Sequence, residues 1–499
     1  MYIGHTMDLF KKLIFILMLL VLHFELKAEE IKDIKDIKEI KEIKKIKEYS
    51  IANTFTFQSK ILGEERSILV SLPSEYDQTN DTYPVHVILD GKQNIEHAVA
   101  TSRMLSNWAG LPKSIIVGIP SVNRNRDFTP SKDVAYSPES GGAKKFADFL
   151  EKEVMTFVDK KYRTHPFRVL TGHSLGGLFA VNQYLKKNPS FNAYIIVAPS
   201  LWWNKQKILS TLAKAKPTEL ARGIPVYLGV GEEDGMTPMV EQLYRLFTEN
   251  NASHRYAYTV YENEGHMSAP MKTFYDGIKH VFSDAVYDES KWESFTSDSF
   301  IEFTESIKHN FGSSVKQTGE LYNKLANFLA TKKNYAGAIT VLKANVQDYP
   351  NYAFNHKDLA NAYALNGNVD QAISEFQKAA DIARKDSSSG QGDALQYERE
   401  INRLRNPITL SEQVLKGFAG CYKSKSGTVF KFSLIDDVFT GHKEGWPDFQ
   451  LYAESDNGFY TRLMGLAPSF KFNANRVDVI ANGQTYPLPK TECKANLNR

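Results

Sequence analysis

Apolar positions in residues 50–288 alternate between short strand-like runs and longer helical patterns. The predicted strands, rich in β-branched and aromatic residues, are Ile51–Gln58, Arg66–Leu72, Val85–Leu89, Ser114–Ile119, Phe167–Thr171, Tyr194–Val197, Val226–Val230 and Ala257–Tyr261. Several are continuously apolar, as expected for strands that are covered on both faces. Helical patterns lie between the later strands, at Gly142–Lys161, Leu178–Lys187 and Met239–Asn250. This alternation predicts an α/β fold with a doubly wound, mostly parallel sheet.

Two segments with other sequence patterns follow this α/β region. In residues 289–406, Leu325-Ala326 and Ala338-Ile339 recur 34 residues later as Leu359-Ala360 and Ala372-Ile373. This spacing resembles the helix pairs of tetratricopeptide repeats, which implies either a groove that binds a protein partner or a helical spacer. Residues 407–499 contain short alternating runs separated by Gly, Asn and Asp, which predict a small antiparallel β domain.

The first 49 residues predict export. Lys11 and Lys12 precede an apolar run over 13–22 and a small residue at Ala28, the layout of a secretory signal peptide over 1–28. The run is too short for a comfortable membrane span, so we expect no stable span after signal removal and a periplasmic or secreted protein; an uncleaved anchor is the alternative. Residues 29–49 place Ile at every third position. Because an α-helix has 3.6 residues per turn, these isoleucines would not line up on one face, which indicates a low-complexity spacer. The alternative is a weak interfacial or coiled-coil segment.

Composition excludes few function classes. The chain has 61 Lys and Arg against 58 Asp and Glu, and no basic stripe outside the N-terminal lysines, which argues against a nucleic-acid partner. No paired His or Cys spacing indicates a metal site, and no cofactor is expected. The two cysteines, Cys421 and Cys493, lie near the ends of the last segment. An oxidising compartment would let them pair, but their spacing alone leaves this open.

One stretch combines a buried strand, a glycine-lined turn and a helix. The turn reads Gly172-His173-Ser174-Leu175-Gly176, the layout of a nucleophile elbow. We expect glycine two places before and after the serine because a Cβ would clash in so sharp a turn. Ser174 is therefore the predicted nucleophile, and the backbone N–H of Leu175 is a predicted oxyanion donor. His173 is expected to point away from the serine hydroxyl.

A serine hydroxyl needs a base, and in this fold class the acid and the histidine follow the serine along the chain. His266 follows the last strand and is the predicted base. The acid should lie after the next-to-last strand, in a loop that contains Glu232, Glu233 and Asp234. Asp234 is the predicted acid, because G-x-x-D followed by proline suits this turn. Glu233 and Glu232 remain rivals.

Further contacts are expected at the carboxyl ends of other strands, where ligands of α/β sheets bind. The backbone N–H of Lys92 is the candidate second oxyanion donor, with Gly91 beside it as a substrate-binding position. Trp202 and Trp203 follow the strand after the elbow and either line an acyl or aryl pocket or are core aromatics. Arg126 either meets an anionic or catechol-type substrate group or pairs with the aspartate that follows it.

Together these segments resemble the esterase D and enterochelin esterase-like branch of the α/β-hydrolases. Besides the elbow, the matching stretches within 55–282 are VILDG at 87–91, VGI at 117–119, RDFTP at 126–130, GG at 141–142, YRT at 162–164, PSLWW at 199–203 and GHMS at 265–268. The resemblance implies a carboxylesterase with Ser174 and His266 at its catalytic positions, whereas the acid position is less uniform. It implies substrates among siderophore esters, feruloyl or acetyl groups on polysaccharides, and small acyl esters.

Three hypotheses follow. The first is an exported serine esterase that cleaves a small-molecule or polysaccharide-linked ester through a Ser-His-Asp triad and an acyl-enzyme. The second is a catalytically idle scaffold that binds a protein partner through its helical repeats; the intact Ser174 and His266 argue against it. The third keeps the serine chemistry but acts on a thioester or a peptide.

Overall fold

The computed structural model describes residues 49–214, 223–249, 255–385, 390–446, 448–462, 468–481 and 483–493. The predicted signal peptide and nearly all of the spacer, residues 1–48, lie outside the described residues. Contacts between Cα atoms separate Met1–Ile51 from Ala52–Arg499, and the latter is one compact unit. The boundaries placed near residues 288 and 406 therefore stay predictions. No helix in the described part of the chain is long and apolar enough to cross a membrane.

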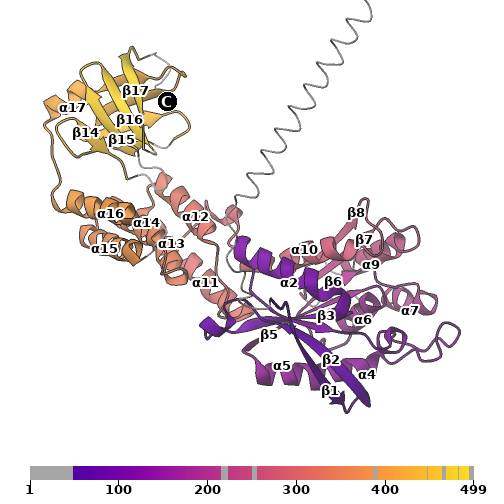
Figure 1. Ribbon diagram of the computed structural model, residues 1–499. Coiled ribbons are helices and arrows are strands. Elements are labelled where there is room, and N and C mark those ends of the chain that lie inside the picture. Colours follow the sequence, from indigo (N-terminus) through magenta and orange to yellow (C-terminus); the bar gives the residue numbers. More distant parts are fainter. Residues whose placement is uncertain are drawn as a thin grey trace, which may run out of the picture. The chain divides into compact units, whose positions relative to one another are not determined.

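An eight-stranded sheet forms the centre of the α/β region, in the order β1-β2-β4-β3-β5-β6-β7-β8 (Figure 1). In this sheet order, each strand from β4 through β3 and β5 to β8 is parallel to its neighbour. The pairs β1 with β2 and β2 with β4 are antiparallel. The strands are β1 Asn53–Ser59, β2 Glu64–Ser71, β3 Tyr83–Leu89, β4 Ile115–Ile119, β5 Thr164–His173, β6 Ala193–Val197, β7 Val226–Gly231 and β8 Tyr256–Tyr261. All eight predicted strands are present, in the doubly wound, mostly parallel sheet that the alternation predicted.

Helices cover both faces of this sheet. Their bounds are α2 Gly91–Trp108, α3 Arg124–Asp127, α4 Ala143–Phe149, α5 Met155–Lys161, α6 Leu175–Tyr184, α7 Trp203–Leu212, α9 Thr237–Glu249 and α10 Ala269–Val281, with a π-helical turn at Leu150–Val154 between α4 and α5. On one face α2 packs beside α10 through His97 and Phe274; on the other, aromatic contacts join α6 to α4 and α9. The pattern did not predict α2, because much of its buried side consists of small residues such as Ala98, Thr101 and Ser102.

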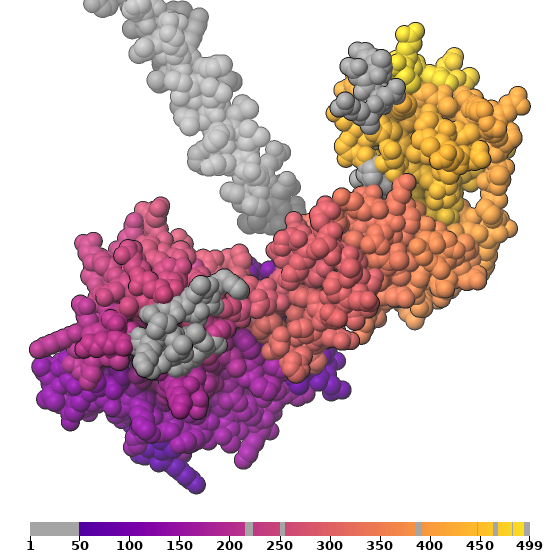
Figure 2. Space-filling view, turned by 180° about the vertical axis from the view of Figure 1, so that it is seen from behind, coloured from indigo at the N-terminus to yellow at the C-terminus, as the bar shows by residue number. Residues whose placement is uncertain are grey.

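A helical region follows, coloured salmon to orange in Figure 2. Its helices are α11 Ser297–Phe311, α12 Gly319–Thr331, α13 Tyr335–Asp348, α14 Ala353–Leu365, α15 Val369–Lys385 and α16 Gly390–Arg405. The starts of α12 and α14 lie 34 residues apart (353 − 319), as do those of α13 and α15 (369 − 335). The helix pairs thus repeat with the period seen in the sequence. That they are tetratricopeptide repeats, or that they bind a partner, stays a prediction.

The C-terminal region contains the short helix α17 Glu412–Phe418 and a nine-stranded antiparallel sheet in the order β12-β11-β10-β9-β17-β16-β15-β14-β13. The strands are β9 Gly420–Lys423, β10 Val429–Ile435, β11 Val438–Lys443, β12 Phe449–Gln450, β13 Tyr452–Ala453, β14 Gly458–Tyr460, β15 Ser469–Asn473, β16 Arg476–Ala481 and β17 Gln484–Thr491. The two edge strands are separated in sequence only by Leu451, so the sheet curls into a nearly closed barrel. Its interior is filled with aromatic side chains, chiefly phenylalanines. The alternating runs in the sequence lie at 420–422, 428–434, 449–452, 458–460, 470–472 and 477–480, so they did not predict β11 or β17. In β17, Pro487 and Pro489 lack an N–H for the ladder, which weakens the strand signal.

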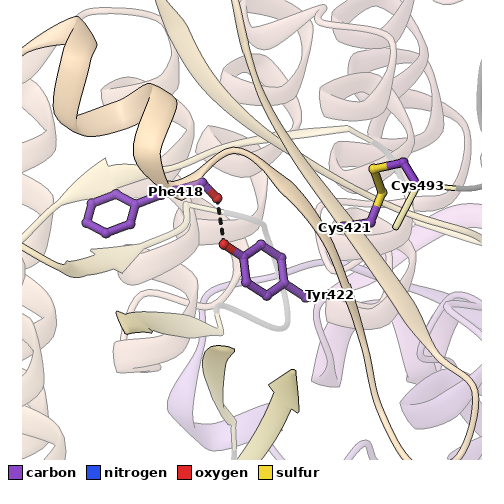
Figure 3. The surroundings of a disulfide bond; sticks show 4 residues. All are labelled: Phe418, Cys421, Tyr422 and Cys493. Carbon is purple, nitrogen blue, oxygen red and sulfur yellow. Dashed lines mark hydrogen bonds between the residues drawn. A yellow bond between two sulfur atoms is a disulfide. The ribbon is translucent and has the colours of Figure 1, made fainter. Parts of the chain in front are cut away.

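A disulfide ties the last described residues to the first strand of this barrel (Figure 3). Cys421 on β9 bonds to Cys493 just after β17, with their Cα atoms 5.3 Å apart. Beside it, the hydroxyl of Tyr422 donates to the backbone carbonyl of Phe418 at 2.9 Å. The bond closes a 72-residue separation, so it restricts the unfolded chain and stabilises the domain.

Candidate active site

Ser174 lies on the turn that joins β5 to α6, and it is only half-buried while its neighbours on both sides are buried. Its backbone has φ 59° and ψ −117°, the strained geometry of a nucleophile elbow. A Cβ on Gly172 would overlap the carbonyl oxygen of Gly176, and one on Gly177 would lie 2.9 Å from that of Val197. On Gly176 the nearest atoms would be 3.5 Å away, an ordinary contact. The expected need for glycine therefore holds at Gly172. On the helix side of the turn, the position that excludes a Cβ is Gly177 and not Gly176.

His266 lies in the loop between β8 and α10, where the sequence placed the base. Its Nδ1 is 2.9 Å from Oε2 of Glu233, in the loop after β7. Asp234, the predicted acid, is exposed instead, whereas its rival Glu233 meets the imidazole. The third candidate, Glu232, accepts a hydrogen bond from the backbone N–H of Asn263 at 2.9 Å and so braces the histidine loop. Two adjacent glutamates thus have separate tasks.

The turn after β7 decides which carboxylate reaches the imidazole. The Thr237 hydroxyl donates to the carbonyl of Gly231 at 2.8 Å and accepts from the N–H of Glu233 at 3.0 Å. The N–H of Glu232 donates to the carbonyl of Glu264 at 2.8 Å, and a Cβ on Gly231 would overlap that same oxygen. These contacts press the two loops together and hold Glu233, one residue before Asp234, over the histidine.

Ser200 and His173 make contacts at the elbow that the sequence did not predict. The Ser200 hydroxyl lies 3.2 Å from that of Ser174, and its N–H donates to the Ser174 carbonyl at 3.0 Å. The imidazole ring of His173 packs against that of His266 with 4.5 Å between centroids, which brings the base loop to the elbow. Burial lowers the pKa of His173 to about 3, so the ring is neutral at physiological pH. The only sequence signal for Ser200 was its place in the PSLWW stretch.

The expected oxyanion donors, Leu175 and Lys92, stand in the first turns of α6 and α2, where backbone N–H groups point outward from the helix. A Cβ on Gly91 would lie 2.6 Å from backbone atoms of β4, so only glycine lets α2 begin this close to the sheet. Asp90, in the left-handed conformation before it, is buried and accepts from Arg124 Nε at 2.9 Å. Arg124 also donates to the carbonyl of His173 at 3.4 Å, which links this loop to the elbow.

Arg126 does not face the site as a free cation. Its guanidinium donates to Glu64 at 2.6 Å and to Asp127 at 2.7 Å, and these pairs raise its pKa. Arg126 therefore makes the internal pairing that was one of the two alternatives left open by the sequence. Arg124, two residues earlier, is the arginine next to the elbow.

Of the two tryptophans, one is a core aromatic residue and the other is accessible beside the elbow. Trp203 is 2% exposed, and its indole N–H donates to the carbonyl of Ser131 at 3.3 Å, so it belongs to the core. Trp202 is 37% exposed and lies against Tyr136, with ring centroids 5.2 Å apart. Trp202 and Tyr136 together form an accessible aromatic surface that starts two residues from Ser200.

The sheet order and the strained serine at the elbow define the class as α/β-hydrolase. The family model named Putative esterase matches residues 59–277. Ferri-bacillibactin esterase BesA of Bacillus subtilis is 30% identical over 214 residues, covering 37% of this chain and 74% of the relative. The siderophore enterobactin esterase of Emericella nidulans is 36% identical over 115 residues, covering 19% of this chain and 38% of the relative.

The chain belongs to this family of putative esterases, and it is a carboxylic ester hydrolase of the enterochelin esterase-like kind. A crystal structure of an uncharacterised protein from Capnocytophaga ochracea superposes with a TM-score of 0.53 over 71% of this chain and 99% of that one. At 15% identity this likeness shows the fold alone. The curated relatives favour an enzyme over an idle scaffold.

Proposed function

We propose that this protein is a serine esterase that cleaves siderophore esters through Ser174, His266 and Glu233. The observation that carries the proposal is the hydrogen bond between His266 Nδ1 and Glu233 Oε2, on a loop that contacts the elbow. Siderophore esters are favoured because relatives from bacteria and fungi are named as bacillibactin, enterobactin and triacetylfusarinine C esterases.

In the proposed reaction, Nε2 of His266 takes the proton of the Ser174 hydroxyl as Oγ attacks the ester carbonyl carbon. The N–H groups of Leu175 and Lys92 donate to the oxyanion that forms, each worth about 3 kcal/mol. Collapse expels the alcohol, which receives the proton from His266, and leaves an acyl-Ser174 ester that water hydrolyses by the same steps. Glu233 accepts from Nδ1–H throughout, which fixes the tautomer and stabilises the imidazolium.

The aromatic surface of Trp202 and Tyr136 is proposed to hold the acyl or aryl part of the ester. Aromatic faces bind flat rings by offset or edge contacts, and the phenol-bearing arms of catecholate siderophores have such rings. The disulfide between Cys421 and Cys493 supports the proposal that the protein works in an oxidising compartment, outside the cytosol.

The test compares wild type with Ser174→Ala, Glu233→Gln and Asp234→Asn, using enterobactin, triacetylfusarinine C and p-nitrophenyl acetate as substrates. Ser174→Ala should abolish turnover of all three. Glu233→Gln should lower kcat by about 10²- to 10⁴-fold with little change in KM, because the neutral amide no longer stabilises the imidazolium. Asp234→Asn is the matched control and should keep nearly full activity.

Two outcomes would contradict the proposal. A loss in Asp234→Asn as large as that in Glu233→Gln would return the acid to Asp234. Cleavage of the siderophore esters is measured by mass spectrometry. If the enzyme hydrolyses p-nitrophenyl acetate but cleaves neither siderophore ester, the proposed substrate class is refuted and the proposed serine mechanism is retained.

A further inference from the structure

A hollow of about 360 Å³ lies between the end of α16, the segment that follows it, and the strands β11, β13 and β14 of the barrel. Its walls are mainly aliphatic and aromatic, with Leu404, Ile408 and Leu451 among them. Two arginines, Arg403 and Arg462, also line it. The volume falls in the range of small-molecule sites, which are apolar hollows with a few fixed polar groups.

The two arginines differ in how their charges are balanced. Arg403 forms ion pairs with Glu400 and Glu454 and lies over the Tyr460 ring, 4.1 Å from its centroid. Arg462 is 9% exposed, yet no carboxylate in the described part of the chain lies within 4 Å of its guanidinium. Asp437, the one acid among the lining residues, is exposed and makes no ion pair with Arg462.

The remaining contacts of Arg462 satisfy only part of its hydrogen-bonding capacity. Its Nη2 donates to the Tyr460 hydroxyl at 3.0 Å, and its Cζ lies 4.4 Å from the ring centroid of Tyr452. Its Nε is buried and has no hydrogen-bond partner among the residues that the structure describes. A buried guanidinium without a counter-anion costs free energy, and a cation–π contact offsets only part of that cost. An anion in the hollow would therefore stabilise this arginine.

We propose that this hollow binds a small carboxylic acid with an apolar body, of about the size of benzoate. The carboxylate would accept from the Arg462 guanidinium, whose planar fork matches two carboxylate oxygens, while the apolar body lies against Ile408 and the aliphatic wall. A single charge is expected, because the acid Asp437 at the same hollow disfavours a second negative group. The inference is independent of the proposed esterase function.

The experiment measures benzoate binding to the full-length protein by calorimetry and ligand-observed NMR, with benzyl alcohol as the neutral counterpart of similar shape. Wild type should bind benzoate, and Ser174→Ala should bind it equally well. Arg462→Met should weaken binding by about tenfold or more, because a charge-assisted hydrogen bond is lost. Arg476→Met, which removes an exposed arginine that pairs with Asp478 on the same barrel, should leave the affinity unchanged.

The proposal fails if wild type shows no benzoate binding up to about 10 mM, if benzyl alcohol binds as well as benzoate, or if Arg462→Met binds like wild type. Because Arg462→Met could misfold the barrel, a second variant, Ile408→Trp, keeps the arginine and fills the hollow. It should also lose benzoate binding while the far-ultraviolet circular dichroism stays that of wild type; retained binding in this variant overturns the site.

Discussion

Two histidines of the hydrolase sheet are buried in their neutral form. His86 on β3 is 1% exposed, its Nε2 is 2.7 Å from the hydroxyl of Thr171, and its ring stacks on Phe274. Burial lowers the pKa of His86 to about 3, as it does for His173. A neutral His173 beside His266, the proposed base, suits the proposed chemistry, because a second positive charge there would oppose formation of the His266 imidazolium.

These histidines make stability fall with acidification. The unfolded histidine takes up a proton below about pH 6.5, whereas the folded one stays neutral until about pH 3. The unfolded state thus binds more protons in this window, and the free energy of unfolding rises with pH across it. His86→Asn should reduce the loss between pH 7 and 5 by about 2 kcal/mol, measured by urea unfolding at both values. An unchanged pH dependence in the variant would mean that His86 is charged in the fold.

At the scale of elements, a buried ion-pair network joins β2 to α3. Arg66 and Asp127 are each 2% exposed and are paired, and Arg66 also lies over the rings of Phe146 and Phe149. The network explains why Arg126 turns inward, since its partner Asp127 is held by Arg66. It also fixes the short helix that carries Arg124 toward the elbow.

Removing one member of this network should be costly, because it leaves a buried charge without its partner. Asp127→Ala is expected to lower the free energy of unfolding by about 3–5 kcal/mol. The control is Glu75→Gln, which breaks the partly exposed surface pair with Lys113 and should cost less than about 1 kcal/mol. Calorimetric unfolding measures the stability of both variants. Equally small losses in the two would show that the buried ion pair contributes little to the free energy of unfolding.

At the scale of the molecule, the helical region is anchored to the hydrolase sheet at the start of β5. Phe311 of α11 packs on Phe167 and Phe282 with ring centroids 5.0 and 5.5 Å apart. The N–H of Thr82 donates to the Ser313 hydroxyl at 2.9 Å. Gly312, with φ 101°, lets the chain pass the carbonyl of Thr82. These contacts fit the single compact unit found for Ala52–Arg499.

Phe311→Ala should loosen this anchor and lower stability by about 3–5 kcal/mol. Because the cluster joins two regions, we expect the calorimetric transition to broaden or split into two. Phe354→Ala, at a 45% exposed position on α14, is the matched control and should leave the transition unchanged. A single, unshifted transition in Phe311→Ala would show that the regions are coupled elsewhere.

Local pattern was enough for the parts of this protein that depend on neighbours in sequence. The apolar runs predicted all eight strands, and the glycine-lined turn predicted the elbow at Ser174 and the loop position of His266. The same reasoning did not find α2, whose buried side is small, or β17, whose prolines resemble a turn. In both, contacts with distant segments outweigh a weak local signal.

The sequence by itself determined the fold class and the glycine-lined turn at Ser174, and it placed His266 in the loop after the last strand, because strand, turn and helix signals are carried by adjacent residues. Only the tertiary structure placed Glu233 rather than Asp234 against the imidazole, turned Arg126 inward, and set Arg462, which has no carboxylate partner among the described residues, beside a hollow. Neighbouring side chains in a loop point in different directions. Which of them meets a partner is fixed by backbone contacts with segments tens of residues away, as Thr237 and Glu264 fix Glu233 here.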